Sequence, residues 1–124
     1  MRLLREIYSN QLKHPHIAEV RESFLSTVGT FISVSHLAED NLMNYRDKLS
    51  SMSVKEISEI MFQICLGLDY THSKGLIHRD ISPDNILVYS DGTFKICDFG
   101  LAAYGSNSHI SAGKEAYMAV EVRK

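Results

Sequence analysis

The sequence has 124 residues, 44% of them hydrophobic, and a net charge of −2 at pH 7. This balance offers no electrostatic basis for binding nucleic acid or an anionic membrane, and no apolar run approaches the about 20 residues of a membrane span. The start is too charged for a secretory signal, and Cys65 and Cys97 form no spaced framework, so we expect a reduced, intracellular and cytoplasmic protein.

The first third of the chain predicts one helix, a hairpin and a second, short helix. Apolar residues near helical spacing predict a helix over residues 2–12. Residues 18–26 and 30–37 predict two strands, with Gly29 in the turn between them. The polar segment 39–50 predicts a short helix.

The clearest predicted element is a long helix that begins after Ser53. Ser53 and Glu56 form a capping box, in which each side chain bonds the other residue's backbone N–H. Apolar residues at helical spacing continue to Leu68, and Gly75 predicts the end of the helix. Because apolar residues occupy much of its circumference, we expect a buried central helix.

The last third predicts a hairpin followed by a long loop. The segment ILVYSDGTFKIC, residues 86–97, predicts two strands joined by a type I′ turn at Asp91 and Gly92. Residues 101–121 are rich in Gly and Ser and show no clear period, so they predict a long loop.

The stretch HRDISPDN, residues 78–85, places Asp80 and Asn85 in a short polar loop. A hairpin that starts at Asn85 returns the chain to Asp98, so these three side chains should converge. Carboxylate and amide oxygens suit Mg²⁺ rather than zinc, and an open magnesium site is suited to phosphoryl transfer. Taken alone, the Asp80 and Asn85 spacing would fit a capped turn, but Asp98 favours the functional interpretation.

These motifs resemble those of the eukaryotic protein kinases. HRDISPDN resembles the catalytic loop, DFG at residues 98–100 the metal-binding motif, and YMAVE at 117–121 the end of the activation segment. The resemblance implies that Asp80 orients a substrate hydroxyl and accepts its proton, while Asn85 and Asp98 bind Mg²⁺. Phe99 would pack in the core that sets active and inactive states.

The same resemblance implies an α+β, partial protein-kinase-like fold. It would run from the αC helix through two N-lobe strands, the hinge, αD, αE, the catalytic loop and a β-hairpin to the activation segment. Its parts would be an N-lobe remnant at 1–34, a hinge at 35–40 and the start of the C-lobe at 41–124. Five residues would contact ATP: Val34, His36, Leu37, Leu87 and Cys97.

Other residues take regulatory or structural roles by resemblance. Glu6 would be the αC glutamate that pairs with a lysine, and Glu121 the glutamate that an arginine clamps further along the chain. Arg79 would clamp a phosphorylated activation loop. The residues available to carry that phosphate are Ser106, Ser108 and Ser111.

Three internal departures from the family pattern affect the site. Ser82 stands where the family has a catalytic-loop lysine, Lys114 where it usually has a threonine, and Val120 where it has a proline. Ser82 and Lys114 are therefore candidate catalytic residues, because the Lys114 ammonium could reach across and replace the missing cation. The alternative is drift in a site no longer used.

Three functions remain open at this point. The first is a serine/threonine protein kinase domain, similar to the NIMA-related or calmodulin-kinase-like groups, which uses ATP and Mg²⁺ on Ser or Thr of a protein substrate. No glycine-rich loop and no lysine precede Glu6, so we expect an incomplete piece of that domain. The second is a pseudokinase or scaffold with a protein partner, and the third is a small-molecule phosphotransferase of kinase-like fold.

Overall fold

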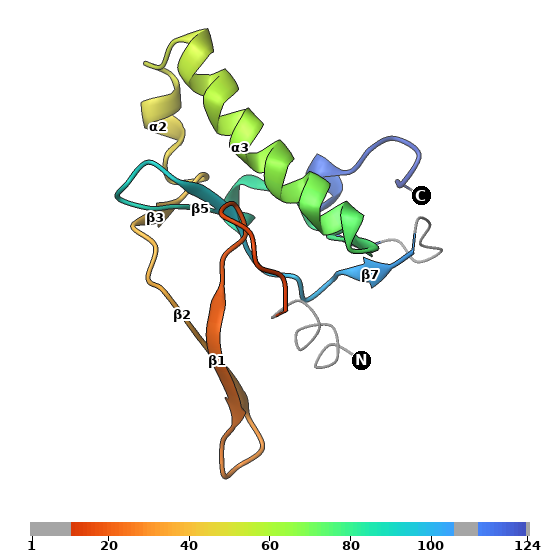
Figure 1. The fold of residues 1–124 in the computed structure, drawn as a ribbon. Helices are drawn as coiled ribbons and strands as arrows, with labels where there is room; N and C mark the ends of the chain where they lie inside the picture. The colour runs from red at the N-terminus through yellow and green to blue at the C-terminus, as the bar shows by residue number, and fades with distance from the viewer. Residues whose placement is uncertain (1–10, 106–111, 124) are drawn as a thin grey trace.

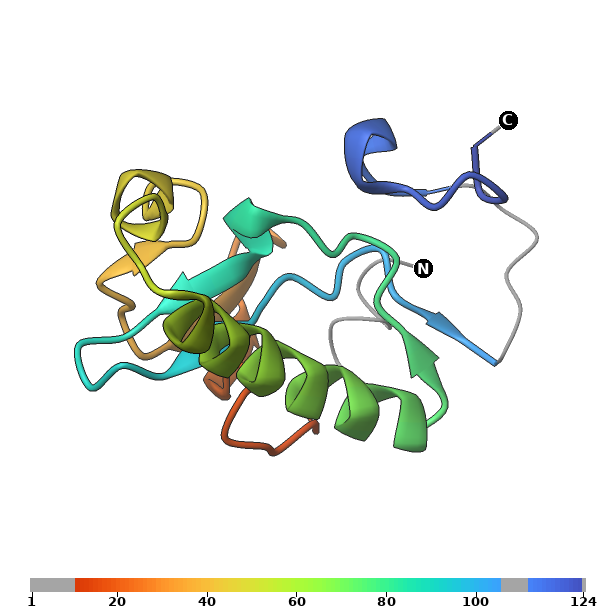
Figure 2. The ribbon, with the colours of Figure 1, turned by 90° about the horizontal axis from the view of Figure 1, so that it is seen from above.

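The computed structural model describes residues 11–105 and 112–123, and a three-stranded sheet stands at its centre. The order β3-β5-β6 is built from β3 (Asp40–Asn41), β5 (Ile86–Val88) and β6 (Phe94–Ile96). The long helix α3 (Val54–Ser73) packs against β6 and crosses the sheet (Figure 2). This helix-on-sheet arrangement confirms the α+β prediction.

The remaining elements are short. β4 (Leu76–Ile77) follows α3 directly and pairs with β7 (Ala103–Tyr104) in a separate two-stranded sheet. The described part of the chain also contains one short helix and two 3₁₀ turns: α2 (Arg46–Leu49), η1 (Pro83–Asn85) and η2 (Glu115–Tyr117).

One buried cluster joins the helix to the sheet. It includes Ile96, which is fully buried, and Ile60 and Ile64, which face the sheet from α3. The whole cluster consists of Leu12, Ile17, Ile60, Ile64, Leu76, Ile86, Val88, Phe94, Ile96, Phe99 and Ala102. Burial of these apolar side chains is the main favourable contribution to the stability of this part.

The start and end of α3 agree with the sequence prediction. The Ser53 hydroxyl accepts the Glu56 N–H at 3.2 Å, and the Glu56 carboxylate accepts the Ser53 N–H at 2.7 Å, so the capping box is formed. At the other end, Gly75 adopts φ +77° and its N–H donates to the His72 carbonyl. Both ends are therefore fixed by local signals.

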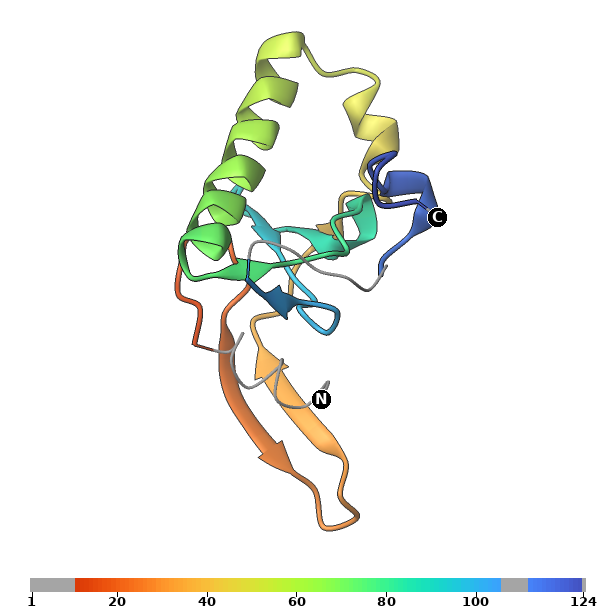
Figure 3. The same cartoon turned by 90° about the vertical axis from the view of Figure 1, so that its right-hand side faces the viewer.

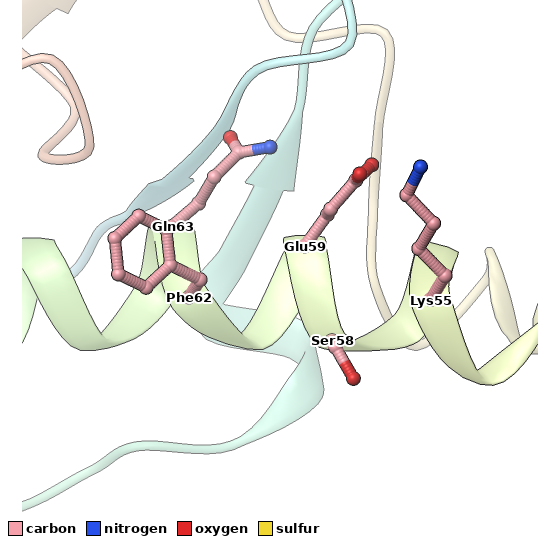
Figure 4. A pocket seen from close by; sticks show the side chains of 5 residues that line it. All are labelled: Lys55, Ser58, Glu59, Phe62 and Gln63. Atoms are coloured by element: carbon pink, nitrogen blue, oxygen red, sulfur yellow. The ribbon is translucent and has the colours of Figure 1, made fainter.

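The predicted all-round burial of α3 is wrong. Only one stripe of the helix is buried, whereas Val54 is 82% and Phe62 is 64% exposed. Figure 4 shows Gln63 directed toward the β5–β6 hairpin, where its carbonyl oxygen accepts the Phe94 N–H at 2.8 Å, while Phe62 lies apart from that contact. The described residues pack against one face of α3. Apolar residues on its opposite face are left exposed.

The β5–β6 hairpin has its predicted strands but not the predicted turn. A type I′ turn needs positive φ at both central residues, and here only Gly92 has it, with φ +83°. The Tyr89 N–H instead bonds the Thr93 carbonyl at 3.0 Å, and the Asp91 carboxylate accepts the Thr93 N–H. The loop therefore contains three residues, one more than predicted, and the Gly92 N–H donates to the Tyr89 carbonyl at 3.0 Å within it.

The β1–β2 hairpin, β1 (Val20–Leu25) and β2 (Phe31–Ser35), confirms the two predicted strands, with Gly29 in the connecting turn at φ +81°. It projects from the body of the molecule (Figure 1; Figure 3). No residue of either strand is buried.

Two predicted segments differ from the structure. Segment 39–50 begins with strand β3, which pairs with β5, and is helical only over Arg46–Leu49. The predicted loop 101–121 contains β7 and the 3₁₀ turn η2. Strands of two residues form through partners far along the chain, and local sequence carries little sign of them.

The helix predicted over residues 2–12, with Glu6, falls almost wholly outside the described residues, and so do Ser106, Ser108 and Ser111. Among the helices that the structure describes, none combines the length and the apolar character that crossing a membrane requires.

Candidate functional site

The polar loop, residues 78–85, brings Asp80 and Asn85 into direct contact. The Asn85 amide NH₂ donates to the Asp80 backbone carbonyl and to the Asp80 Oδ2, each at 2.9 Å. The Asn85 N–H also donates to the Ser82 carbonyl, which closes η1 around Pro83. Because both bonds use the amide nitrogen, the amide oxygen of the buried Asn85 is the atom available to a cation.

His78 ties the polar loop to the segment that carries Asp98. Its Nε2–H donates to the Cys97 carbonyl at 2.8 Å, and its Nδ1 accepts the Asp80 N–H at 3.1 Å. Burial lowers the pKa of His78, which favours the neutral ring that these two bonds require. The Phe99 ring lies edge-on to His78, with 4.7 Å between centroids.

Asp98 follows a residue that is bonded to the polar loop, and its own Oδ1 accepts the Gly100 N–H at 3.2 Å. The Cys97 N–H donates to the Asn85 carbonyl at 2.9 Å, so the residue before Asp98 is bonded to the end of the polar loop. Asp98 and Arg79 are the non-glycine residues with positive φ in the described part of the chain, at +58° and +70°. Such backbone conformations are costly and concentrate at functional sites.

The donor set around Asp98 fits magnesium. Asn85 and Asp98 offer an amide oxygen and a carboxylate, and Mg²⁺ prefers oxygen ligands while keeping positions for water and phosphate. Within residues 11–105 and 112–123, no group of three His, Cys, Asp or Glu side chains could hold a metal ion by itself. Asn85 and Asp98 would hold such an ion together with oxygen atoms of water or phosphate.

Lys114 enters this site from a segment 34 residues beyond Asp80. Its ammonium donates to Asp80 Oδ1 at 2.9 Å, to Asp80 Oδ2 at 3.0 Å and to the Ser82 hydroxyl at 3.1 Å. It also lies 3.3 Å from Asp84 Oδ2. The hydrogen bonds to Asp80 raise the pKa of Lys114, so the side chain stays charged.

Asp84 is a site residue that the sequence analysis missed. The Ser82 hydroxyl donates to Asp84 Oδ1 at 2.6 Å, and this bond, together with Lys114, lowers the pKa of Asp84. Its signal was available in the Ser-Pro-Asp spacing, which places a carboxylate two residues after the serine.

A cleft opens beside the end of β2. Its lining residues include His36, Leu37 and Leu87, three of the five residues predicted to contact a nucleotide; the full lining is Ser35, His36, Leu37, Ala38, Asp40, Asn41 and Leu87. Val34 and Cys97 do not line it. Cys97 is half-buried, and burial raises the pKa of its thiol to about 11.

The remaining predicted residues lie at the edges of this region. Arg79 donates from Nε to the Leu101 carbonyl at 2.6 Å, and Glu121 is exposed near the end of the described chain. Val120 is 83% exposed. The segment carrying Lys114 and η2 lies beside the polar loop (Figure 2; Figure 3).

The sequence of this chain is similar to those of known proteins. The family model described as protein kinase domain matches residues 1–124. Cyclin-dependent kinase F-3 of Oryza sativa subsp. japonica is 41% identical over 107 residues, 85% of this chain and 24% of the relative. CBL-interacting serine/threonine-protein kinase 20 of Arabidopsis thaliana is 35% identical over 127 residues, 95% of this chain and 28% of the relative. The chain thus spans about a quarter of the length of these two relatives.

Proposed function

The chain belongs to the protein kinase domain family, and we propose that it carries the phosphoryl-transfer site of a serine/threonine protein kinase that uses ATP and Mg²⁺. Two similar proteins bear names of serine/threonine-protein kinases, CBL-interacting kinase 20 and crk1 of Schizosaccharomyces pombe, which favours a protein substrate over a small molecule. Neither name is NIMA-related, and that subgroup stays a prediction.

The observation that carries this proposal is the pairing of Asp80 with Asn85. The Asn85 amide fixes one carboxylate oxygen of Asp80, and His78 holds the Asp80 backbone through a second bond. A carboxylate held from two sides is suited to accept a proton at a fixed place.

The proposed reaction is a single displacement. The oxygen of a substrate Ser or Thr hydroxyl forms a bond to the γ-phosphorus of ATP, and the bond from that phosphorus to the bridging oxygen breaks. The electron pair leaves with ADP, and the hydroxyl proton passes to the Asp80 carboxylate. Asn85 and Asp98 would hold Mg²⁺, which neutralises phosphate charge when bound.

The cleft at the end of β2 is the proposed place for the adenine. It lies beside Leu87 on β5, directly after the polar loop, so a nucleotide bound there could reach Asp98 with its phosphates. His36 and Leu37 would offer backbone groups, and Leu87 an apolar surface, which is the usual composition of a small-molecule site.

The test is Asp80→Asn, which removes the proton acceptor and keeps the shape of the side chain. We expect the rate of phosphate transfer to a Ser- and Thr-containing peptide library to fall about 10²–10⁴-fold. Asp47→Asn, an exposed change on α2, is the matched control and should keep the parent rate. An unchanged rate in Asp80→Asn would contradict the proposal.

A pseudokinase or scaffold is the second candidate function, and one contact favours it. Both oxygens of Asp80 already bond to Lys114, so the proton acceptor is occupied by a cation within the chain. A protein of this kind would bind nucleotide or a partner protein without transferring phosphate. Nucleotide binding by the parent protein, with no transfer under any condition, would decide for this alternative.

A further inference from the structure

The Lys114 ammonium contacts two of the carboxylates that a phosphate group would meet in the proposed site. Asp80 and Asp84 both contact the ammonium, and Asp98 follows the residue bonded to Asn85. A phosphate group arriving beside Asp80 would therefore meet several negative charges. In the described part of the chain, Lys114 is the side chain whose ammonium is bonded to two of them.

Gly113 permits this approach. It adopts φ +102°, a conformation that other residues rarely take, and a Cβ added to it would lie 2.3 Å from the Arg79 carbonyl oxygen. The backbone of residue 113 is thus in close contact with the polar loop. Only glycine allows the segment to come near enough for the next side chain to reach Asp80.

Ser82 is fitted to receive Lys114. Its side chain is buried, its hydroxyl accepts a hydrogen bond from the Lys114 ammonium, and the same hydroxyl donates to Asp84. A serine at this position therefore has a defined role as a link between a cation and a carboxylate. Random drift at residues 82 and 114 gives no reason for such a satisfied network.

We propose that Lys114 supplies the positive charge that contacts the transferred phosphoryl group, taking the place of a lysine at position 82. This inference rests on the proposed function. When a substrate hydroxyl bonds to Asp80, it competes for the carboxylate oxygens that Lys114 now uses. The ammonium then has an N–H to donate to an oxygen of the transferred phosphoryl group.

The test moves the positive charge between residues 114 and 82. Lys114→Met should lower kcat about 10²–10³-fold, the usual cost of removing one preorganised electrostatic group. The double variant Ser82→Lys with Lys114→Ser should regain most of that loss. Lys55→Met, an exposed change on α3, is the matched control and should keep the parent kcat.

A binding measurement adds a readout that does not depend on activity. Lys114→Met should weaken binding of a non-hydrolysable ATP analogue about 10-fold, as expected for one lost charged hydrogen bond, and leave ADP binding unchanged. Retained ADP binding also shows that the variant is folded.

Two results would overturn the inference while leaving the proposed function intact. One is a parent-like kcat in Lys114→Met. The other is a double variant no faster than Lys114→Met, although it binds ADP like the parent. Failure of the proposed function looks different, because the parent protein itself would then transfer no phosphate, whether or not it binds the analogue, and the inference would fall with it.

Discussion

The polar loop and the β1–β2 hairpin are held in place by different kinds of contact. The loop is bonded to two distant segments, to Cys97 through both His78 and Asn85 and to Lys114 through Asp80. The hairpin is held mainly by its own ladder, and none of its strand residues is buried. Phe24 and Leu25 in β1 are 45% and 60% exposed.

This difference shows that backbone and side-chain positions are more tightly constrained in the polar loop than in the β1–β2 hairpin. Bonds from several parts of the chain fix the loop against more than one displacement, which is what proton transfer at a defined atom requires. A hairpin held by one ladder can open without disturbing the core. The three predictions that follow test whether the two regions belong to different cooperative units.

The largest expected difference comes from the same substitution in the buried core beside the polar loop and in the β1–β2 hairpin. Ile96→Ala removes a fully buried side chain between α3 and the sheet and should cost about 2–5 kcal/mol of the free energy of unfolding. Ile32→Ala, on the half-buried edge of β2, should cost about 1 kcal/mol or less. Urea titration of both variants measures the contrast, and equal losses would show that the hairpin is part of the core.

The second prediction uses pH to act on the loop through His78. Burial lowers the pKa of His78, with Lys114 acting in the same direction and Asp80 and Asp98 against it. Below about pH 6.5 the unfolded chain therefore takes up a proton that the folded chain refuses, so stability should fall as the solution is acidified. The slope for this one group is at most about 1.4 kcal/mol per pH unit.

His78→Gln should flatten this pH dependence, since glutamine can donate and accept without titrating. The pKa of His14 is also lowered, mainly by burial, so the quantity to compare is the slope of the variant against that of the parent. Parallel slopes in the parent and in His78→Gln would remove His78 as the cause.

The sequence best predicted the structural features that depend on residues close together in the chain. The capping box of Ser53 and Glu56 and the end of α3 at Gly75 depend on neighbours within a few residues, and both were found. The contact between Asp80 and Asn85 also lies within one short loop. In each case the residues that interact are close enough in the chain for their spacing to carry the information.

The features that the sequence did not predict depend on residues that are far apart along the chain. Strand β3 exists because Asp40 and Asn41 pair with Val88 and Leu87. One face of α3 is exposed because the described residues leave it uncovered. The bond between Ser82 and Asp84 could be inferred from their spacing, but the approach of Lys114, 30 residues later, to 3.3 Å from Asp84 could not. Spacing alone cannot reveal such encounters, because they are settled by tertiary packing.

The smallest expected effect comes from two glycines in matched turns. Gly29 in the β1–β2 turn and Gly92 in the β5–β6 turn have φ +81° and +83°, and a Cβ added to either would meet nothing within 4 Å. Alanine at each position therefore introduces the same backbone strain, about 1–2 kcal/mol, without a steric clash.

The strain should nevertheless appear in different measurements. Gly92→Ala acts on a hairpin whose strands belong to the core, so it should lower the free energy of global unfolding by about 1 kcal/mol. Gly29→Ala should leave global unfolding nearly unchanged and speed amide exchange in β1 and β2, because that hairpin can open alone. If Gly29→Ala lowers global stability as much as Gly92→Ala does, the two regions unfold together and the contrast between them is only one of exposure.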